Sequence, residues 1–132
     1  MLFQVLDLTL AVELQSLFRV LPAPETVREE GSPPWMAGHF QVEGKEVALL
    51  KSEVLLLGKE PRQGHGPYVL VLDGGSWAFD ADALVENVEI PKERIMWRFV
   101  RARPWMRGIL AERLVAVVDL QERVRFLNRE GQ

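Results

Sequence analysis

Two stretches, "PPWMAGHF" at residues 33–40 and "RPWMRGIL" at residues 103–110, decide how the whole chain is organised. Both contain Pro-Trp-Met-x-Gly, although the 132 residues include only four Trp and four Met. Because self-similarity at a fixed spacing marks repeated structural units, the recurrence predicts an internal duplication. We expect Trp35 and Trp105 to fill equivalent corners of the two copies and to be at least half buried.

The residues after each Trp-Met predict a hairpin followed by a short helix. The first copy reads "WMAGHFQVEGKEVALLKSEVLLLG" and the second "WMRGILAERLVAVVDLQERVRFL". "VALL" from Val47 matches "VAVV" from Val115 at an offset of 68, so the second hairpin is two residues tighter. The turns are expected at Glu43-Gly44 and near Glu112-Arg113. Each copy ends in apolar residues at helical spacing (Leu50, Val54, Leu57 and Leu120, Val124, Leu127), and Gly58 suits the end of the first helix.

The repeat extends upstream of each Trp-Met. Residues 6–14 alternate apolar and other side chains, which predicts a half-buried strand, and a helix of one to two turns is expected from there to residue 21. The counterpart "PYVLVLDGGSWAFDADALVENV" predicts two strands around Asp73-Gly74-Gly75 and a short helix at "ALVENV", with Leu17 matching Leu84 at an offset of 67. We therefore predict a single domain, 1–132, with a first half of about 1–58, a linker "GKEPRQGHGP" at 58–67, and a second half of about 67–127.

Composition excludes several classes of protein. With 48% apolar and 27% charged residues, the chain is typical of an ordinary globular domain. The absence of Cys removes disulfides, thiolate nucleophiles and Cys-based metal sites. A formal net charge of −3 disfavours general nucleic-acid binding. The N-terminus lacks the features of a signal peptide and no uncharged run is long enough to span a membrane, so we expect a cytoplasmic protein.

Catalytic and metal-binding patterns are weak. His39 and His65 are far apart, and no Ser stands in a nucleophile elbow. Asp80 and Asp82, two apart on a predicted strand, share one face as paired catalytic acids sometimes do, but such a pair is more typical of a solvated face. We expect no enzyme activity, no cofactor and no metal.

One stretch, "RIMWRFVRARPWMR" at 94–107, leaves alternatives open. Its five Arg interleave with Trp97, Phe99 and Trp105, a pattern typical of surfaces that stack single-stranded nucleic acid. The same pattern suits Arg stems lying over the aromatic residues of a core, or a docking face for an acidic protein. The acidic net charge disfavours nucleic acid as the partner of this stretch.

The order of these segments resembles the CheW-like coupling proteins of bacterial chemosensory arrays, over nearly the whole chain. "AVELQSLFRVL" and "SPPWMAGHFQVEGKEVALLKSE" are similar to that family's first half, and the two segments of the second half quoted above to its later strand pair, closing hairpin and helix. The resemblance implies an all-β fold with a few short helices, built from two five-stranded, SH3-like β-barrel halves related by a pseudo-twofold axis.

The resemblance also implies a function. Members of that family are non-enzymatic adaptors that join a CheA-type histidine kinase, through its regulatory domain, to the cytoplasmic tips of chemoreceptors. It implies a cytoplasmic location, peripheral to membrane-bound receptor arrays, without membrane insertion. The partner-binding residues carried over by motif position are Leu17, Arg19, Val20, Gly38, Glu43 and Gly44. Gly38→Asp is accordingly expected to abolish binding and to leave the fold intact.

The chain departs from the family pattern where that pattern contacts partners. The family's Asn-Leu-Arg-Gly reads Gln41-Val42-Glu43-Gly44 here, and its acidic residue after the helix valine is Arg19. The N-terminal strand is also short, because only Met1–Leu6 is available for it, so either the turn collapses around Asp7 or an edge strand is missing. Reversal of sign at both Arg19 and Glu43 predicts an ion pair that has exchanged its partners. These departures favour a divergent pathway, such as pilus-driven motility.

Overall fold

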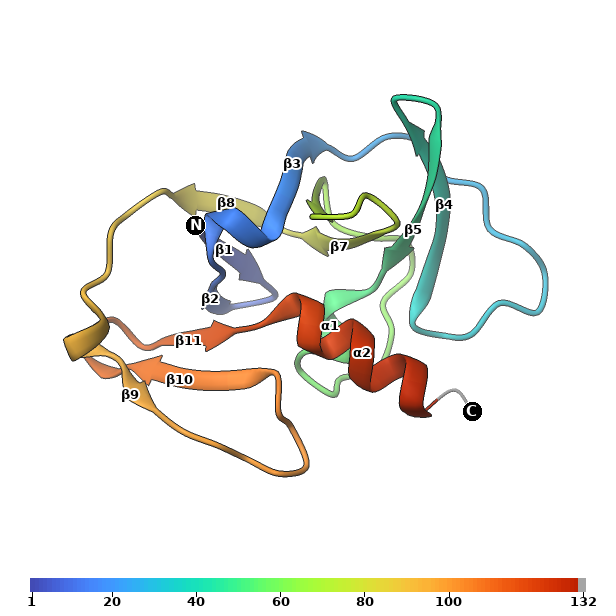
Figure 1. Ribbon diagram of the computed structural model, residues 1–132. Helices are drawn as coiled ribbons and strands as arrows, with labels where there is room; N and C mark the ends of the chain where they lie inside the picture. The colour runs from blue at the N-terminus through green and yellow to red at the C-terminus, as the bar shows by residue number, and fades with distance from the viewer. Residues whose placement is uncertain (131–132) are drawn as a thin grey trace.

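The computed structural model describes the backbone of residues 1–130 and the side chains of residues 1–127, and it consists of two β-sheets with short helices (Figure 1). The strand order is β8-β1-β2-β11-β10-β9 in the six-stranded sheet and β3-β6-β7-β5-β4 in the five-stranded sheet. The predicted fold class, all-β with short helices in two SH3-like halves, is confirmed.

The six-stranded sheet contains β1 (Leu2–Val5), β2 (Leu8–Ala11), β8 (Ala83–Glu86), β9 (Met96–Trp97), β10 (Met106–Leu110) and β11 (Val115–Val118). The five-stranded sheet contains β3 (Leu17–Pro22), β4 (Met36–Val42), β5 (Lys45–Leu50), β6 (Tyr68–Leu72) and β7 (Trp77–Ala81). The helical segments are the 3-10 turns η1 (Leu14–Ser16), η2 (Lys92–Arg94) and η3 (Ala111–Arg113), and the α-helices α1 (Ser52–Leu55) and α2 (Leu120–Glu130).

Each sheet combines strands from both parts of the duplicated sequence. The β1–β2 hairpin joins the β10–β11 hairpin through a parallel pairing of β2 with β11. The β6–β7 hairpin joins the β4–β5 hairpin through the equivalent parallel pairing of β7 with β5. Because neither sheet can form from one sequence half, the two copies of the repeat depend on each other for folding.

The registers show how closely the two copies correspond. Leu17 lies opposite Leu72 in β6, and Leu84 lies opposite Phe3 in β1. In both pairs of strands the register shifts directly beyond this position, so even the β-bulge is repeated. The predicted offset of 67 between Leu17 and Leu84 is confirmed.

The two Trp-Met corners are also equivalent. The carbonyl of Trp35 accepts a hydrogen bond from the amide of Lys51 at 2.8 Å, and the carbonyl of Trp105 accepts one from the amide of Asp119 at 2.8 Å. Trp105 is only 6% exposed, and the half-buried Trp35 packs against the same core. The prediction of equivalent, at least half-buried tryptophans is confirmed.

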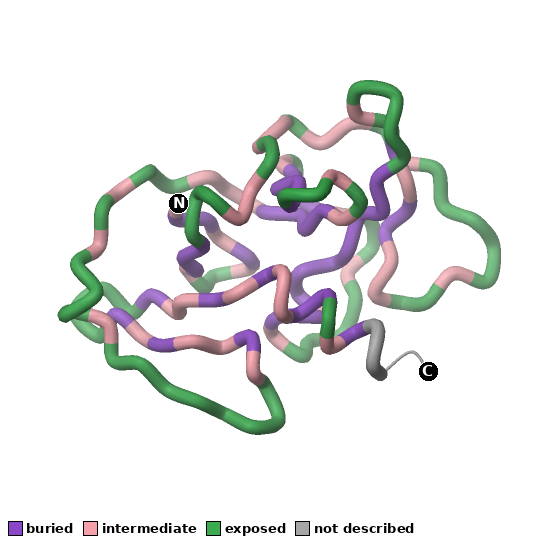
Figure 2. Tube along the Cα trace, viewed as in Figure 1, coloured by how far each residue is buried: buried purple, intermediate pink, exposed green. Residues whose placement is uncertain are grey.

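Three clusters of buried side chains explain the continuous apolar runs. The largest contains residues of both sheets and of the helices, and each smaller cluster lies within one sheet. Figure 2 shows where the buried residues lie along the chain. Leu50 and Leu72 belong to the largest cluster, whereas their neighbours Leu49 and Val71 belong to the cluster of the five-stranded sheet. Strands β5 and β6 are therefore buried on both faces, as uninterrupted apolar strands commonly are.

The prediction of one strand over residues 6–14 is wrong. Leu6, with φ of 57°, and Asp7 form a turn that separates β1 from β2. Leu8 and Leu14 are 45% and 54% exposed, so the alternation of leucines does not mark a core face. Of the two alternatives for the N-terminus, the structure has the short turn at Asp7, between the paired strands β1 and β2.

The short helices predicted near residues 14–21 and 83–88 are also wrong. Only the 3-10 turn η1 forms in the first segment, and both segments then continue as strands, β3 and β8. Each pairs with an apolar strand, β6 or β1, so its backbone bonds are made across a sheet instead of within a helix. The later helices do form as α1 and α2, and Gly58, with φ of 66°, follows α1 and donates to the carbonyl of Val54 at 3.1 Å.

Candidate functional site

An ion pair connects β3 with the β4–β5 turn, as the reversed charges predicted. Arg19 Nη2 lies 3.0 Å from Glu43 Oε1, and the two side chains are 47% and 57% exposed. Glu43 and Gly44 have φ of 49° and 80°, which is the backbone of a tight two-residue hairpin turn. Arg19 lies on a strand, not on the short helix that was expected.

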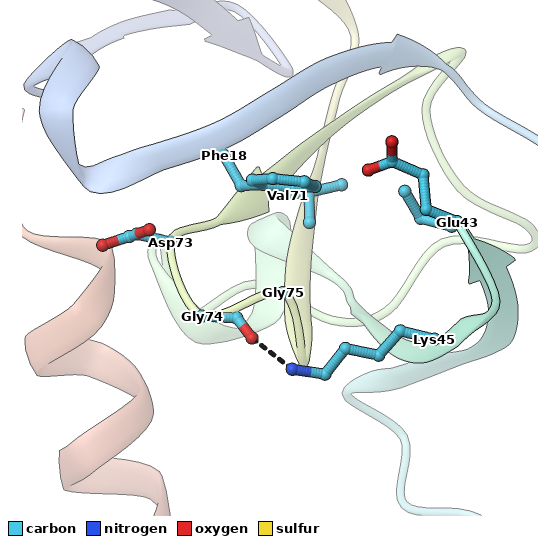
Figure 3. Close-up of a pocket in the computed structure, with 8 residues that line it drawn as sticks. Phe18, Glu43, Lys45, Val71, Asp73, Gly74 and Gly75 are labelled. Carbon is cyan, nitrogen blue, oxygen red and sulfur yellow. Dashed lines mark hydrogen bonds between the residues drawn. The ribbon is translucent and has the colours of Figure 1, made fainter.

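A hollow of about 400 Å³ lies beside this ion pair (Figure 3). Glu43 and Lys45 extend from the β4–β5 turn on one side, and Asp73 and Gly74 from the β6–β7 turn on the other, where the Lys45 ammonium donates to the Gly74 carbonyl. The apolar lining of the hollow includes Phe18, which is 47% exposed. An apolar floor inside a charged rim is typical of a protein-binding surface.

The other expected contact residues support this surface from below. Leu17 and Val20 are half-buried and pack against the largest core cluster, so they hold β3 in place. Gly38 has φ of 148°, and a Cβ atom there would lie 2.8 Å from the carbonyl oxygen of Val27. This geometry contradicts the expectation that Gly38→Asp leaves the fold intact, because the side chain would collide with the Val27 backbone, which pairs with β4 at His39.

A second ion pair occupies the equivalent place in the other copy. Arg113 Nη2 lies 2.7 Å from Glu86 Oε1 and connects β8 with the β10–β11 turn. The registers put Glu86 in the place of Arg19, so the second pair has the same geometry with opposite signs. Sequence analysis missed it, although the offset of 67 that aligns Leu17 with Leu84 also aligns Arg19 with Glu86.

Asp80 is not on a solvated face, which corrects the prediction for the Asp80 and Asp82 pair. Asp80 is 1% exposed, and its carboxylate accepts the amides of Ser52 and Gly66, each at 2.8 Å. Burial raises the pKa of Asp80 above its usual value in spite of these bonds. Asp82 instead binds both Nη atoms of Arg62 at 3.1 Å.

This cluster fixes segment 58–67 to the body of the protein. The Arg62 amide donates to the carboxylate of the fully buried Glu53 at 2.9 Å, and the Arg62 guanidinium lies 3.5 Å from the same carboxylate. Hydrogen bonding and charge attraction from Asp82 and Glu53 raise the pKa of Arg62. The acids of this region therefore act as structural anchors.

The structure divides the Arg-rich stretch 94–107 into a buried part and an exposed part. Trp105 lies in the core, where the Arg123 guanidinium carbon is 4.2 Å from the centre of its ring. Residues from Met96 to Arg103 are exposed. Trp105 therefore cannot stack a base beside Trp97 and Phe99, and the aromatic row needed for a nucleic-acid platform does not form.

The two histidines lie on different segments of the fold. His39 lies on β4 and His65 lies in segment 58–67, where its Nδ1 is 2.8 Å from the Gly66 carbonyl oxygen. Among the described residues, no three His, Cys, Asp or Glu side chains converge as metal ligands. No helix in the part of the chain that the structure describes has the length and apolar character needed to cross a membrane.

Comparison with known proteins points to one family. A family model described as a CheW-like domain matches residues 1–126. The crystal structure of the scaffolding protein TtCheW from Thermoanaerobacter tengcongensis superimposes with a TM-score of 0.74 at 15% sequence identity. The match covers 90% of this chain and 82% of TtCheW. A search of curated proteins found no match.

Proposed function

Because the chain belongs to the CheW-like domain family, we propose that it is a cytoplasmic, non-enzymatic adaptor that couples a CheA-type histidine kinase to the tips of chemoreceptors. Family membership supports the adaptor role in general. The proposal adds the two partners, and it adds the surface around Arg19 and Glu43 as the place where one of them binds.

The observation that carries the choice of surface is the exposed Arg19–Glu43 pair at the rim of the hollow. Of the six expected contact residues, these two have exposed charged side chains that a partner can reach without a change in the fold. Leu17, Val20, Gly38 and Gly44 contribute by shaping β3 and the β4–β5 hairpin. Since the charges are reversed relative to the family pattern, a partner adapted to the usual signs would be repelled. This supports a pathway with its own matched kinase or receptor, such as pilus-driven motility.

The test measures binding of the purified chain to the regulatory domain of a CheA-type kinase and to a receptor-tip fragment from the same organism, by titration calorimetry. We expect Glu43→Arg to weaken one of these complexes by at least about tenfold, the scale of a lost charge-assisted contact. Arg113→Glu is the matched control, because it breaks the equivalent ion pair in the other copy.

Two results would count against the proposal. Failure of the unaltered chain to bind either fragment would remove the adaptor function proposed here. Equal weakening by Glu43→Arg and Arg113→Glu would leave the adaptor function in place and remove the assigned surface, because both variants would then act through a common loss of structure.

A further inference from the structure

The exposed part of the Arg-rich stretch has a composition that the adaptor surface does not explain. All eight residues from Met96 to Arg103 are exposed, and they form β9 and the loop that projects between β9 and β10 (Figures 1 and 2). Four of them are large apolar residues: Met96 at 50%, Trp97 at 53%, Phe99 at 76% and Val100 at 43% exposure. Consecutive exposed apolar side chains of this size are a mark of an interaction surface.

The charge of this segment is of one sign and is not neutralised within the protein. Segment 94–107 contains five Arg and no acidic residue. Arg94 and Arg107 form ion pairs with Glu112 and Asp119. Among the described residues, Arg98, Arg101 and Arg103 have no acidic partner, so their guanidinium groups are available to bind carboxylates.

The backbone of β9 offers a second means of binding. β9 is the last strand of its sheet, and among the described residues no strand lies beyond it. Met96 pairs with Ile109, and the Arg98 amide donates to the carbonyl of Arg107 at 2.9 Å. Because antiparallel pairs alternate, the amide and carbonyl of Trp97 then point away from β10, toward a possible additional strand.

A small hollow is formed by β10 and the loop that follows β9. It has a volume of about 200 Å³ and is lined by Arg98, Val100, Arg103, Met106, Gly108 and Ile109. The space is of the size of one large apolar side chain, and two Arg residues belong to its lining. Gly108 lets β9 lie close to β10, since a Cβ atom there would lie 2.8 Å from the Met96 carbonyl oxygen.

We propose that an extended acidic segment of a partner protein binds as an added strand along β9, with one of its apolar side chains in the hollow between Arg98 and Arg103. Strand addition uses the free backbone groups of an edge, and pockets for alternate side chains give such complexes their specificity. Carboxylates two residues from the apolar side chain would face the same side of the added strand, where the free Arg groups lie. A protein segment fits these features together, whereas a nucleic-acid strand would use neither the sheet edge nor the side-chain hollow.

The equivalent place in the other copy has the opposite character and supplies an internal comparison. There Val27 pairs with His39 as an isolated bridge, and the neighbouring residues include Glu25, Glu29 and Glu30. Val27 is 73% exposed, so that loop is itself an acidic segment with an apolar side chain. A second copy of this chain is therefore the competing occupant, which the experiment must separate from a different protein.

The test uses a defined peptide and does not require the natural partner. The probe has nine residues with blocked ends, in which glutamate alternates with threonine and leucine replaces the central glutamate. Titration into the isotope-labelled full chain is followed by the amide signals of residues 94–110. We expect saturable shifts confined to this segment and the adjoining β10.

Three changes in the peptide and one double substitution in the protein define the binding mode. Replacement of the peptide's leucine by glycine, or of its glutamates by lysine, should each reduce affinity by at least about tenfold. Methylation of the backbone nitrogens of the leucine and its two neighbours should do the same, because it blocks strand pairing. In the protein, Arg98→Glu with Arg103→Glu should abolish the shifts, whereas Lys59→Glu with Arg125→Glu, which removes the same charge elsewhere, should not.

Each other outcome overturns the proposal. If the glycine peptide binds as well as the leucine peptide, the segment attracts acidic chains by charge only. If the N-methylated peptide binds normally, no strand is added at β9. If sedimentation of the unaltered chain shows self-association that Arg98→Glu with Arg103→Glu removes, the occupant is a second copy. Since none of these measurements uses the kinase or receptor, they are independent of the adaptor proposal.

Discussion

Replacement of Trp105 by Ala is the most direct test of how the duplicated corners hold this fold together. Trp105 is 6% exposed, and its ring meets Phe126 edge to face with 5.0 Å between centroids. The Arg123 guanidinium carbon lies 4.2 Å from the centre of the same ring and 5.6 Å from the centre of the Phe126 ring. Alanine would therefore leave a cavity, remove an aromatic pair and take away the surface that covers a buried Arg side chain.

The expected loss of unfolding free energy is about 3–5 kcal/mol, the range for deletion of a large buried aromatic side chain. The contact between the two aromatic rings adds roughly 0.5–1.5 kcal/mol to the stabilisation from burial alone. We therefore expect a loss in the upper part of the range for Trp105→Ala. Trp105 Nε1 is buried and has no hydrogen-bond partner among the described residues, so no hydrogen bond is lost with it. Trp105→Phe, which keeps an aromatic ring, should cost less, about 1–2 kcal/mol. Trp35→Ala is the matched comparison and should also cost less, because Trp35 is only half-buried.

The assay is urea unfolding followed by far-ultraviolet circular dichroism, which does not depend on the tryptophan signal. The slope of free energy against urea should stay constant across the variants, so that midpoints report stability. A loss below about 1 kcal/mol for Trp105→Ala would refute the reasoning and return Trp105 to a binding role. A greater loss for Trp35→Ala than for Trp105→Ala would refute the ranking by burial.

Three further predictions concern charges and one glycine. Arg19→Glu and Glu43→Arg should each reduce stability by about 0–1 kcal/mol, and the double exchange should recover it in a double-mutant cycle. Gly38→Ala should lower stability by about 1–3 kcal/mol in thermal melts, because of its positive φ and the contact with the Val27 carbonyl. The raised pKa of Asp80 means that folding favours its protonated form, so its contribution to stability falls as pH rises above 3.8, and Asp80→Asn should flatten that part of the curve of stability against pH.

Each of these three predictions has its own contradicting result. Additive losses in the cycle of Arg19 and Glu43 would mean that the pair seen in the structure contributes nothing in solution. A Gly38→Ala protein that melts like the original would show that the segment around Val27 can shift away from β4. An unchanged pH dependence after Asp80→Asn would assign the titration to another group.

The contact made by a charged residue or a glycine could be predicted from the sequence where that contact follows from a motif. The Arg19–Glu43 pair was predicted correctly because two positions of one pattern had reversed together. The expectation that Gly38→Asp leaves the fold intact was wrong, because a Cβ atom at Gly38 would lie 2.8 Å from the carbonyl oxygen of Val27, in a loop that pairs with β4 at His39. A shared motif shows that a glycine stands at the same position in two proteins. It does not show why a glycine is needed there.

The sequence by itself determined the duplication, the two Trp-Met corners, the terminal helix and the family, because each follows from local spacing or from repetition. Only the tertiary structure decided that segments after Leu14 and after Asp82 are strands, since both pair with apolar strands distant in the chain. It also decided that Asp80 is buried while Met96–Trp97 is exposed. Side-chain periodicity reports which faces of an element differ, whereas pairing between distant strands determines which face meets the core and which edge remains open.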